Sequence, residues 1–452
     1  MVRFARGVVG TGLLGAACAL PLAAQSMALP AVDPVGIARS GAQVAYGFSL
    51  EAATLNPALL SALKEKTGFY LSAGMETSSI QQSMESNQGL TPITYYSHDR
   101  NRGIFGFGFS RNLTPALTLG LKLDEPYIRH AELRDDAPTR YFGDGISFTS
   151  HRLEGQAAWA FNPNVSVGIG LGVARLAYES TTVMRLNVPN PAPLADSLVE
   201  QRVGQSGEKV VPSYSLGVRW AINPRWTIGF AHQSSLKGDL DMKAEFRDTP
   251  LGYFDSTGLG NPLAGTPARA NAMLAASTPV SATKTFELPS RTTLGFRHRL
   301  RSMITWEADL TWTSAGILAP DFPTVQTPYA LTAAPAELPR TKGHLALSAS
   351  AEYELGKFWT LRGGLTLDQR SVDESLTEPL LGGSRTAGFS VGAGYRVWGG
   401  ELNLGYQFRQ SEDQDTHGLV GVWSATGFHN AGTRVRLEGM GHLMAIGFKK
   451  TF

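Results

Sequence analysis

The chain has 452 residues, enough for one large β-barrel or for two or three ordinary domains, and its formal net charge is only +2. A charge this small gives no support for nucleic acid as a partner. The single cysteine, Cys18, excludes a disulfide within the chain, and we expect no metal or other cofactor.

Residues 1–28 have the three parts of a bacterial export signal. Two arginines lie near the start, residues 7–22 form an apolar stretch, and Ser26-Met27-Ala28 gives a small-x-small cleavage site. The apolar stretch is short for a membrane-spanning helix, and no later stretch has about 18 consecutive apolar residues. The mature chain is therefore expected to begin near Leu29. A lipoprotein signal that ends at Cys18 is the alternative.

Residues 29–66 do not have the pattern of a strand. The segment is rich in Ala, Gly and Ser, and it contains the run Asn56-Pro57-Ala58-Leu59. The proline would break a β-ladder, whereas the Ala and Leu residues around it favour short helical turns. A weakly polar segment of this kind before a barrel predicts an N-terminal plug, or hatch, inside it. A disordered leader is the alternative, but the segment is more apolar than disordered chains are.

Residues 67–452 contain one strand pattern after another, and we expect them to form the barrel domain. In residues 165–178, for example, Val165, Val167 and Ile169 share one face and the small residues between them share the other. Fourteen strands are expected, at residues 68–77, 103–111, 116–124, 146–161, 165–178, 212–222, 226–246, 288–299, 304–316, 341–355, 359–370, 386–397, 401–409 and 437–452.

The last of these stretches shows why a membrane barrel is preferred over a soluble sandwich. Its even positions, such as Met440, Met444 and Ile446, are mostly large and apolar, and its odd positions are mostly small or polar. In a bilayer the outward face must be apolar, while the lumen can be polar. Connections alternate between short turns and long loops, as periplasmic turns and extracellular loops do. The sequence therefore predicts an all-β protein, a transmembrane antiparallel β-barrel of the bacterial outer membrane.

Three local patterns resemble the FadL/TodX family of outer-membrane transporters for long-chain fatty acids and other hydrophobic compounds. The Asn56-Pro57-Ala58-Leu59 run is similar to the family's N-terminal hatch. Residues 119–127 are similar to a family strand that ends in Pro-Tyr before a long extracellular loop. Residues 213–218 together with 228–238 are similar to a strand pair that ends in a Ser-rich motif.

This resemblance implies passive uptake of a long-chain fatty acid or a related hydrophobic molecule. The ligand would be captured by apolar loops, pass to a pocket in the barrel, and leave sideways through the wall when the hatch shifts. Partitioning between apolar sites suits a solute that gains nothing from a water-filled pore. The expected surroundings are outer-membrane lipid and lipopolysaccharide, and the resemblance implies a monomer.

Inward-facing bases are the candidate ligand-binding residues. By strand parity Arg219, Arg297 and Arg396 face the lumen, opposite the apolar residues of their strands. The planar fork of an arginine matches a fatty-acid carboxylate. The alternative is that these bases are neutralised by inward acids, such as Glu307 and Asp309.

Other features have two readings each. Pro126 cannot donate to a ladder, so it marks a lateral opening or an ordinary strand end. The loops at residues 187–200, 250–277 and 317–338 are rich in Ala, Leu and Pro, so they collect hydrophobic solutes or pack over the barrel mouth. The hatch role of residues 56–59 comes from the resemblance, and the alternative is a simple structural turn.

Two rival functions are a general porin for small polar solutes and an outer-membrane lipolytic enzyme. A general porin should have an open lumen and polar loops. The plug-like segment predicts instead that the lumen is blocked. A lipolytic enzyme needs a nucleophile and a base. The motif Gly388-Phe389-Ser390-Val391-Gly392 matches Gly-x-Ser-x-Gly, but it lies in the middle of an expected strand, where no nucleophile elbow can form. We therefore expect no enzymatic activity.

Overall fold

The structure is a computed structural model. The expected export signal lies outside the residues it describes apart from Ala28, and so does most of the three apolar loops. The described residues are 28–46, 50–63, 67–85, 93–98, 100–133, 145–187, 198–251, 280–301, 303–317, 323–326, 330–333, 340–371, 384–412, 414–416, 421–424, 427–430 and 434–452.

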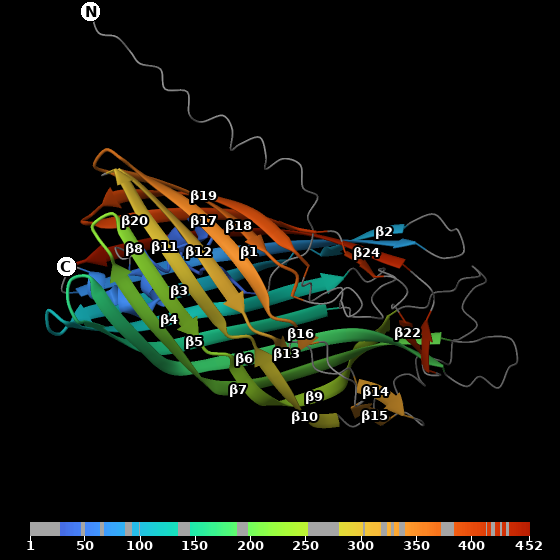
Figure 1. The fold of residues 1–452 in the computed structure, drawn as a ribbon. Helices are drawn as coiled ribbons and strands as arrows, with labels where there is room; N and C mark the ends of the chain where they lie inside the picture. Colours follow the sequence, from blue (N-terminus) through green and yellow to red (C-terminus); the bar gives the residue numbers. More distant parts are fainter. Residues whose placement is uncertain are drawn as a thin grey trace, which may run out of the picture.

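Long antiparallel strands close into a barrel, as Figure 1 shows. The last strand pairs with the first from Gly68 opposite Thr451 to Glu85 opposite Arg434, and this pairing closes a 14-strand barrel. The barrel strands are β1 (Thr67–Glu85), β3 (Arg100–Asn112), β4 (Leu117–Leu133), β5 (Gly145–Ala160), β6 (Val165–Asn187), β7 (Leu198–Ala221), β8 (Trp226–Gln233), β11 (Arg291–Arg301), β12 (Ile304–Thr313), β17 (His344–Leu355), β18 (Trp359–Asp368), β19 (Thr386–Val397), β20 (Gly400–Ser411) and β24 (Arg434–Thr451).

Further strands lie at the end where the long connections are. β9 (Leu236–Leu251) and β10 (Val280–Leu288) continue β8 and β11, and they pair with each other. The remaining strands are β2 (Ile93–His98), β13 (Gly316–Ile317), β14 (Pro323–Gln326), β15 (Ala330–Ala333), β16 (Arg340–Thr341), β21 (Gln414–Thr416), β22 (Gly421–Ser424) and β23 (Gly427–Asn430). Among these, β14 and β15 form a separate two-stranded sheet. The predicted 14-strand barrel is confirmed, although the stretch expected as one strand at residues 226–246 is divided at Ser234 and Ser235 into β8 and β9.

The outer surface is apolar because side chains alternate along each strand, and the large apolar ones face outward. In β24, Met440, Met444 and Ile446 are 41–50% exposed, whereas Leu443 and Ala445 on the other face are buried. Aromatic side chains collect at the end with the short turns, as in the interfacial girdles of membrane barrels. They include Trp159, Phe161, Trp220, Trp226, Phe358, Trp359 and Trp398.

The N-terminal segment, residues 28–63, contains three short helices: α1 (Pro34–Ala38), η1 (Glu51–Thr54) and η2 (Pro57–Ala62). Two of them begin in the same way. Asp33 and Asn56 are N-caps that accept a backbone N–H, and a proline occupies the first helical position after each. Among the described residues, no helix is long and apolar enough to cross a membrane.

Candidate functional site

The N-terminal segment lies against the inner face of the barrel, and inward glycines make the room for it. A methyl group added at Gly168 would overlap the backbone of Pro57 and Ala58, and one at Gly217 would overlap the Asn56 amide. Further glycines whose added methyl group would meet this segment are Gly106, Gly120, Gly229, Gly295, Gly364, Gly392, Gly405 and Gly447. Because these positions lie on strands around the barrel, the segment lies inside the barrel and contacts several sides of its wall.

Asn56 joins the segment to itself and to the wall. Its Nδ2 donates to the carbonyl oxygen of Val44 at 2.8 Å and to that of Val218 on β7 at 3.1 Å, while its Oδ1 accepts from Ala58 N. Leu59 and Ala58 have no exposed surface. The run Asn56-Pro57-Ala58-Leu59 is therefore a structural junction between the segment and the barrel.

The wall is interrupted beside Pro126. The β4–β5 register shifts between Asp124 and Tyr127, so Glu125 and Pro126 together lie opposite His151 alone. The β3–β4 ladder ends where Phe107 pairs with Leu123. Beyond Leu123, toward the C-terminal end of β4, the described ladder partner of β4 on the β3 side is β2, which pairs with it from Glu132 onward. The side chains of β3 and β4 therefore border a break in the hydrogen-bonded wall.

The first described residues, 28–32, cover this break from the inside. Leu29 N donates to the Pro126 carbonyl oxygen at 3.1 Å, and Arg291 Nη1 donates to the Leu29 carbonyl oxygen at 3.0 Å. Leu29 and Val32 belong to a buried cluster with Ile104 of β3 and Ile128 of β4. We call residues 28–32 the strap.

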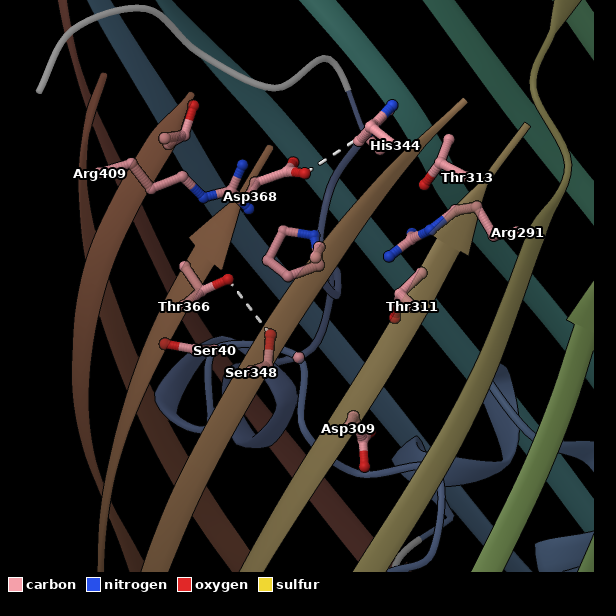
Figure 2. Close-up of a pocket in the computed structure, with 15 residues that line it drawn as sticks. Ser40, Arg291, Asp309, Thr311, Thr313, His344, Ser348, Thr366, Asp368 and Arg409 are labelled. Carbon is pink, nitrogen blue, oxygen red and sulfur yellow. Dashed lines mark hydrogen bonds and ion pairs between the residues drawn. The ribbon is translucent and has the colours of Figure 1, made fainter. Parts of the chain in front are cut away.

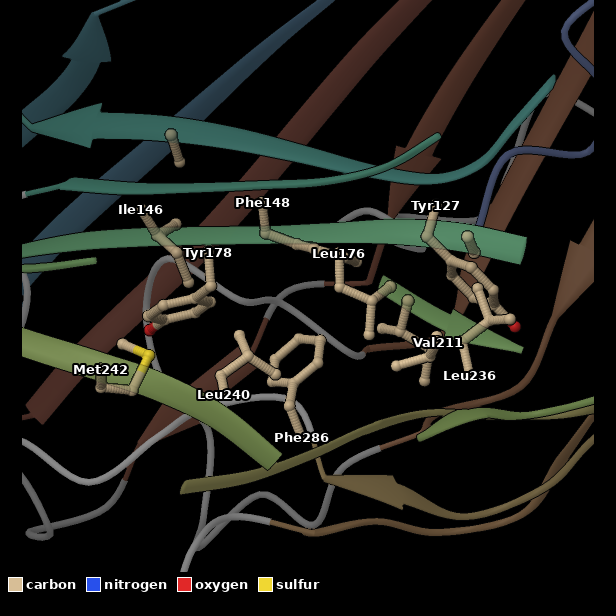
Figure 3. Close-up of a cluster of buried hydrophobic side chains, with 13 residues drawn as sticks. Tyr127, Ile146, Phe148, Leu176, Tyr178, Val211, Leu236, Leu240, Met242 and Phe286 are labelled. Atoms are coloured by element: carbon tan, nitrogen blue, oxygen red, sulfur yellow. The ribbon is translucent and has the colours of Figure 1, made fainter. Parts of the chain in front are cut away.

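An apolar cluster covers the inner wall next to the strap, and Figure 3 shows how its side chains meet. The ring of Phe286 lies 5.6 Å from that of Phe148 and 5.8 Å from that of Tyr178, measured between centroids. Ala28 of the strap packs against the same cluster. Its members are Tyr127, Ala131, Ile146, Phe148, Ala174, Leu176, Tyr178, Val211, Leu236, Leu240, Met242, Phe286 and Leu288.

A polar cavity of about 50 Å³ lies on the wall formed by β11, β12 and β17 to β20 (Figure 2). Two arginines, Arg291 and Arg409, reach it, and Ser40 and Gly41 of the N-terminal segment border it. The remaining lining includes Ala28, Pro30, Asp309, several hydroxyls, and a 3.5 Å contact between His344 Nε2 and Asp368 Oδ1. The lumen above the N-terminal segment therefore has an apolar side and a polar side. Pockets for drug-sized ligands run to about 300–1,000 Å³, so this cavity holds only a small polar group.

The three candidate bases lie elsewhere. Arg297 is buried beneath the N-terminal segment, with its guanidinium 5.7 Å from the Tyr46 ring. Arg219 is half-buried. Arg396 is exposed at the short-turn end, where it donates to the Lys357 carbonyl oxygen at 3.3 Å. None of the three lines the polar cavity.

The alternation in residues 401–409 also turns Arg409 to the lumen, but alternation alone cannot single it out, because many inward positions are charged. Arg291 lies at the start of its strand, where parity is least certain. The apolar cluster was missed because it joins residues from β4 to β10, which only closure of the wall brings together. Ser390 lies within β19, as the sequence indicates, and its hydroxyl donates to the Ala38 carbonyl oxygen at 2.9 Å.

Asp33, at the junction between the strap and α1, supports one prediction. Asp33 has no exposed surface. This burial, together with the negative charge of Glu51, raises the pKa of Asp33 from an ordinary 3.8 to about 6. The native state therefore holds this proton more tightly than the unfolded state, and the segment loses stability as the pH rises from about 4 to 6. The loss above pH 6 is about 3 kcal/mol at most.

Asp33→Asn keeps a good N-cap but cannot ionise. We expect it to remove this pH dependence and to strengthen the segment at pH 7. Hydrogen exchange of the α1 amides, corrected for the intrinsic effect of pH, measures both. Equal pH profiles for the two proteins would contradict the assignment.

A closed barrel with an apolar, girdled outer surface and a lumen occupied by its own N-terminal segment defines an integral transport protein of the outer membrane. Comparison with protein families gives the same class. The model described as outer membrane protein transport protein (OMPP1/FadL/TodX) matches residues 14–452, so the chain belongs to this family.

Solved structures show the same fold. A Pseudomonas aeruginosa FadL homologue has a TM-score of 0.74 at 16% identity, with 95% of this chain and 100% of that chain covered. The toluene transporter TodX of P. putida gives 0.61 at 13% identity, covering 94% and 99%. The toluene transporter TbuX of Ralstonia pickettii gives 0.56 at 13% identity, also covering 94% and 99%. Comparison with curated protein sequences found no match.

Proposed function

We propose that this protein mediates passive uptake of hydrophobic molecules, and that the ligand leaves through the wall break at Pro126. The observation that supports this most is the position of the strap. It touches the apolar cluster through Ala28 and covers the break through Leu29 and Val32. An apolar molecule displaced from the cluster therefore meets the strap before it meets the bilayer.

In this mechanism the N-terminal segment, residues 29–66 with its Asn56-Pro57-Ala58-Leu59 junction, is the hatch that prevents a continuous water channel. The apolar cluster binds the ligand, since each Å² of apolar surface removed from water contributes about 25 cal/mol. Movement of the strap then uncovers Ile104 and Ile128 beside the break. The step needs no cofactor and no energy source, because the ligand moves down its gradient between apolar environments.

We propose a long-chain fatty acid or a related amphiphile as the ligand, with outer-membrane lipid and lipopolysaccharide around the barrel. The polar cavity is the reason for preferring a molecule with a carboxylate. Arg291 and Arg409 border this cavity, and they replace Arg219, Arg297 and Arg396 as the proposed partners of the carboxylate. The barrel holds its own hatch and wall break, so we propose that it works as a monomer and is not an enzyme.

Uptake and swelling assays test this function. Bacteria that lack their own route for fatty acids should take up labelled oleate when they produce this protein. Liposomes that contain the purified protein should not swell in sugar solutions. Rapid swelling would favour a general porin and would contradict the proposal, as would a failure to take up both oleate and toluene.

Ligand-binding measurements on the purified protein can test the proposed head-group site. Arg291→Gln or Arg409→Gln should weaken oleate binding by roughly tenfold or more, because a hydrogen bond to a charged group contributes about 1.5–3 kcal/mol. Toluene binding should not change. Arg396→Gln is the matched control, since this side chain is exposed at the other end of the barrel. An equal loss of oleate and toluene binding would contradict a carboxylate site.

A further inference from the structure

Two neighbouring carboxylates of β12 hold three successive backbone N–H groups of the hatch. Asp309 Oδ2 accepts from Gln43 N at 2.9 Å and from Val44 N at 3.0 Å, and Glu307 Oε1 accepts from Ala45 N at 2.6 Å. Both carboxylates are at most 2% exposed. Burial excludes the water that would compete for these hydrogen bonds, so they hold the hatch backbone more firmly than exposed hydrogen bonds would.

Arg39 of the hatch supplies positive charge to the same place. Its Nη2 lies 2.9 Å from Glu307 Oε2, and it has no exposed surface. Its guanidinium lies 4.2 Å from the Tyr46 ring centroid, and the Tyr46 hydroxyl donates to Glu352 Oε1 of β17 at 2.8 Å. Removing one partner of such a buried pair leaves the other charge without compensation, so this contact resists separation.

The strap is held differently from the rest of the hatch. Its described hydrogen bonds are the two made by the Leu29 backbone and a 3.3 Å bond from the Ser72 hydroxyl to the Val32 carbonyl oxygen. Breaking these bonds separates no pair of buried opposite charges. Asp33, the N-cap of α1, directly follows the strap and separates it from the residues that make the charged contacts.

We propose that Arg39, Glu307 and Asp309 are positioning residues that fix residues 34–63 to the β12 wall, so that this part stays in place during uptake. The three residues act through the position of the hatch, and Asp309 also borders the polar cavity. This inference rests on the proposed function, because it assumes that residues 29–60 block the lumen.

A reversible cross-link can test the anchor. Ser40 Oγ of the hatch lies 2.8 Å from Ser390 Oγ of β19, so Ser40→Cys with Ser390→Cys places two thiols side by side. Cys18→Ala removes the only native cysteine. In this background Arg39→Met removes the hatch charge without changing the barrel, and Glu307→Gln with Asp309→Asn removes the wall charges. Heat-modifiable migration in gels verifies that each barrel is folded.

With the thiols reduced, we expect both charge variants to admit sugars into liposomes, and oxidation should seal them again. In the protein with unchanged charges, the disulfide should leave toluene uptake unaffected, because toluene has no carboxylate to place in the polar cavity that Ser40 borders. Absence of a leak in the reduced variants, a leak that survives oxidation, or loss of toluene uptake on oxidation would each overturn the inference. If deletion of residues 29–60 also failed to open the barrel, the hatch assignment itself would fail, and the two failures are thus distinguished.

Discussion

Deletion of residues 29–60 should convert the closed barrel into an open, non-selective pore. These residues contact the wall at the inward glycines and are the proposed hatch, and a 14-strand wall is wider than side chains alone can fill. The charges that now face the hatch, such as Glu307 and Asp309, would then face water, so the empty barrel avoids buried unpaired charge. Channel conductance in planar bilayers and liposome swelling with sugars measure the change, from background to porin-like rates.

A point substitution provides the matched control for the shortened chain. Gly168→Val would place methyl groups where the backbone of Pro57 and Ala58 now lies, so it should displace the hatch and produce part of the same leak. Gly103→Val is the neutral counterpart, because an added methyl group there meets nothing within 4 Å. A deletion variant that folded and stayed closed would show that the lumen is blocked by something other than the hatch.

Removal of Pro126 alone should stop uptake while ligand binding in the lumen persists. At present Glu125 and Pro126 lie opposite the single residue His151, and the register is regular on both sides of them. Deleting one residue restores one-to-one pairing and keeps every later side chain on its present face. A straight β4 can then continue its ladder with β3 and close the break. Oleate uptake should fall to that of cells without the protein.

Pro126→Ala separates the break from the proline itself. This variant keeps the extra residue and the carbonyl oxygen that accepts from Leu29, so uptake should be close to that of the unchanged protein. Oleate quenching of intrinsic fluorescence reports binding in both variants. Normal uptake by the deletion variant would show that the ligand does not leave at this place.

Much of the architecture could be predicted from local patterns. Alternation in stretches such as residues 165–178 and 437–452 identified the strands and the face each turns to the bilayer, because side-chain direction along a strand repeats every two residues. The Ala and Leu residues around Pro57 predicted short helical turns for an equally local reason, and η2 (Pro57–Ala62) is such a turn. For Pro126, the sequence predicts a lateral opening or an ordinary strand end. β4 continues through it to Leu133, so it is not a strand end, and the lateral opening stays a prediction.

The contents of the lumen depended on how the wall closes. Phe148 and Phe286 are 138 residues apart in the chain, and only the barrel's register brings their rings to 5.6 Å. Closure of the barrel likewise decided which arginines border the polar cavity. Arg291 and Arg409 border it, whereas Arg396 does not. The sequence by itself thus determined the strands, their faces and the plug-like segment, whereas the tertiary structure decided what meets across the lumen. Side-chain direction is a local property of the backbone, but contact across a barrel depends on strand number, tilt and stagger together.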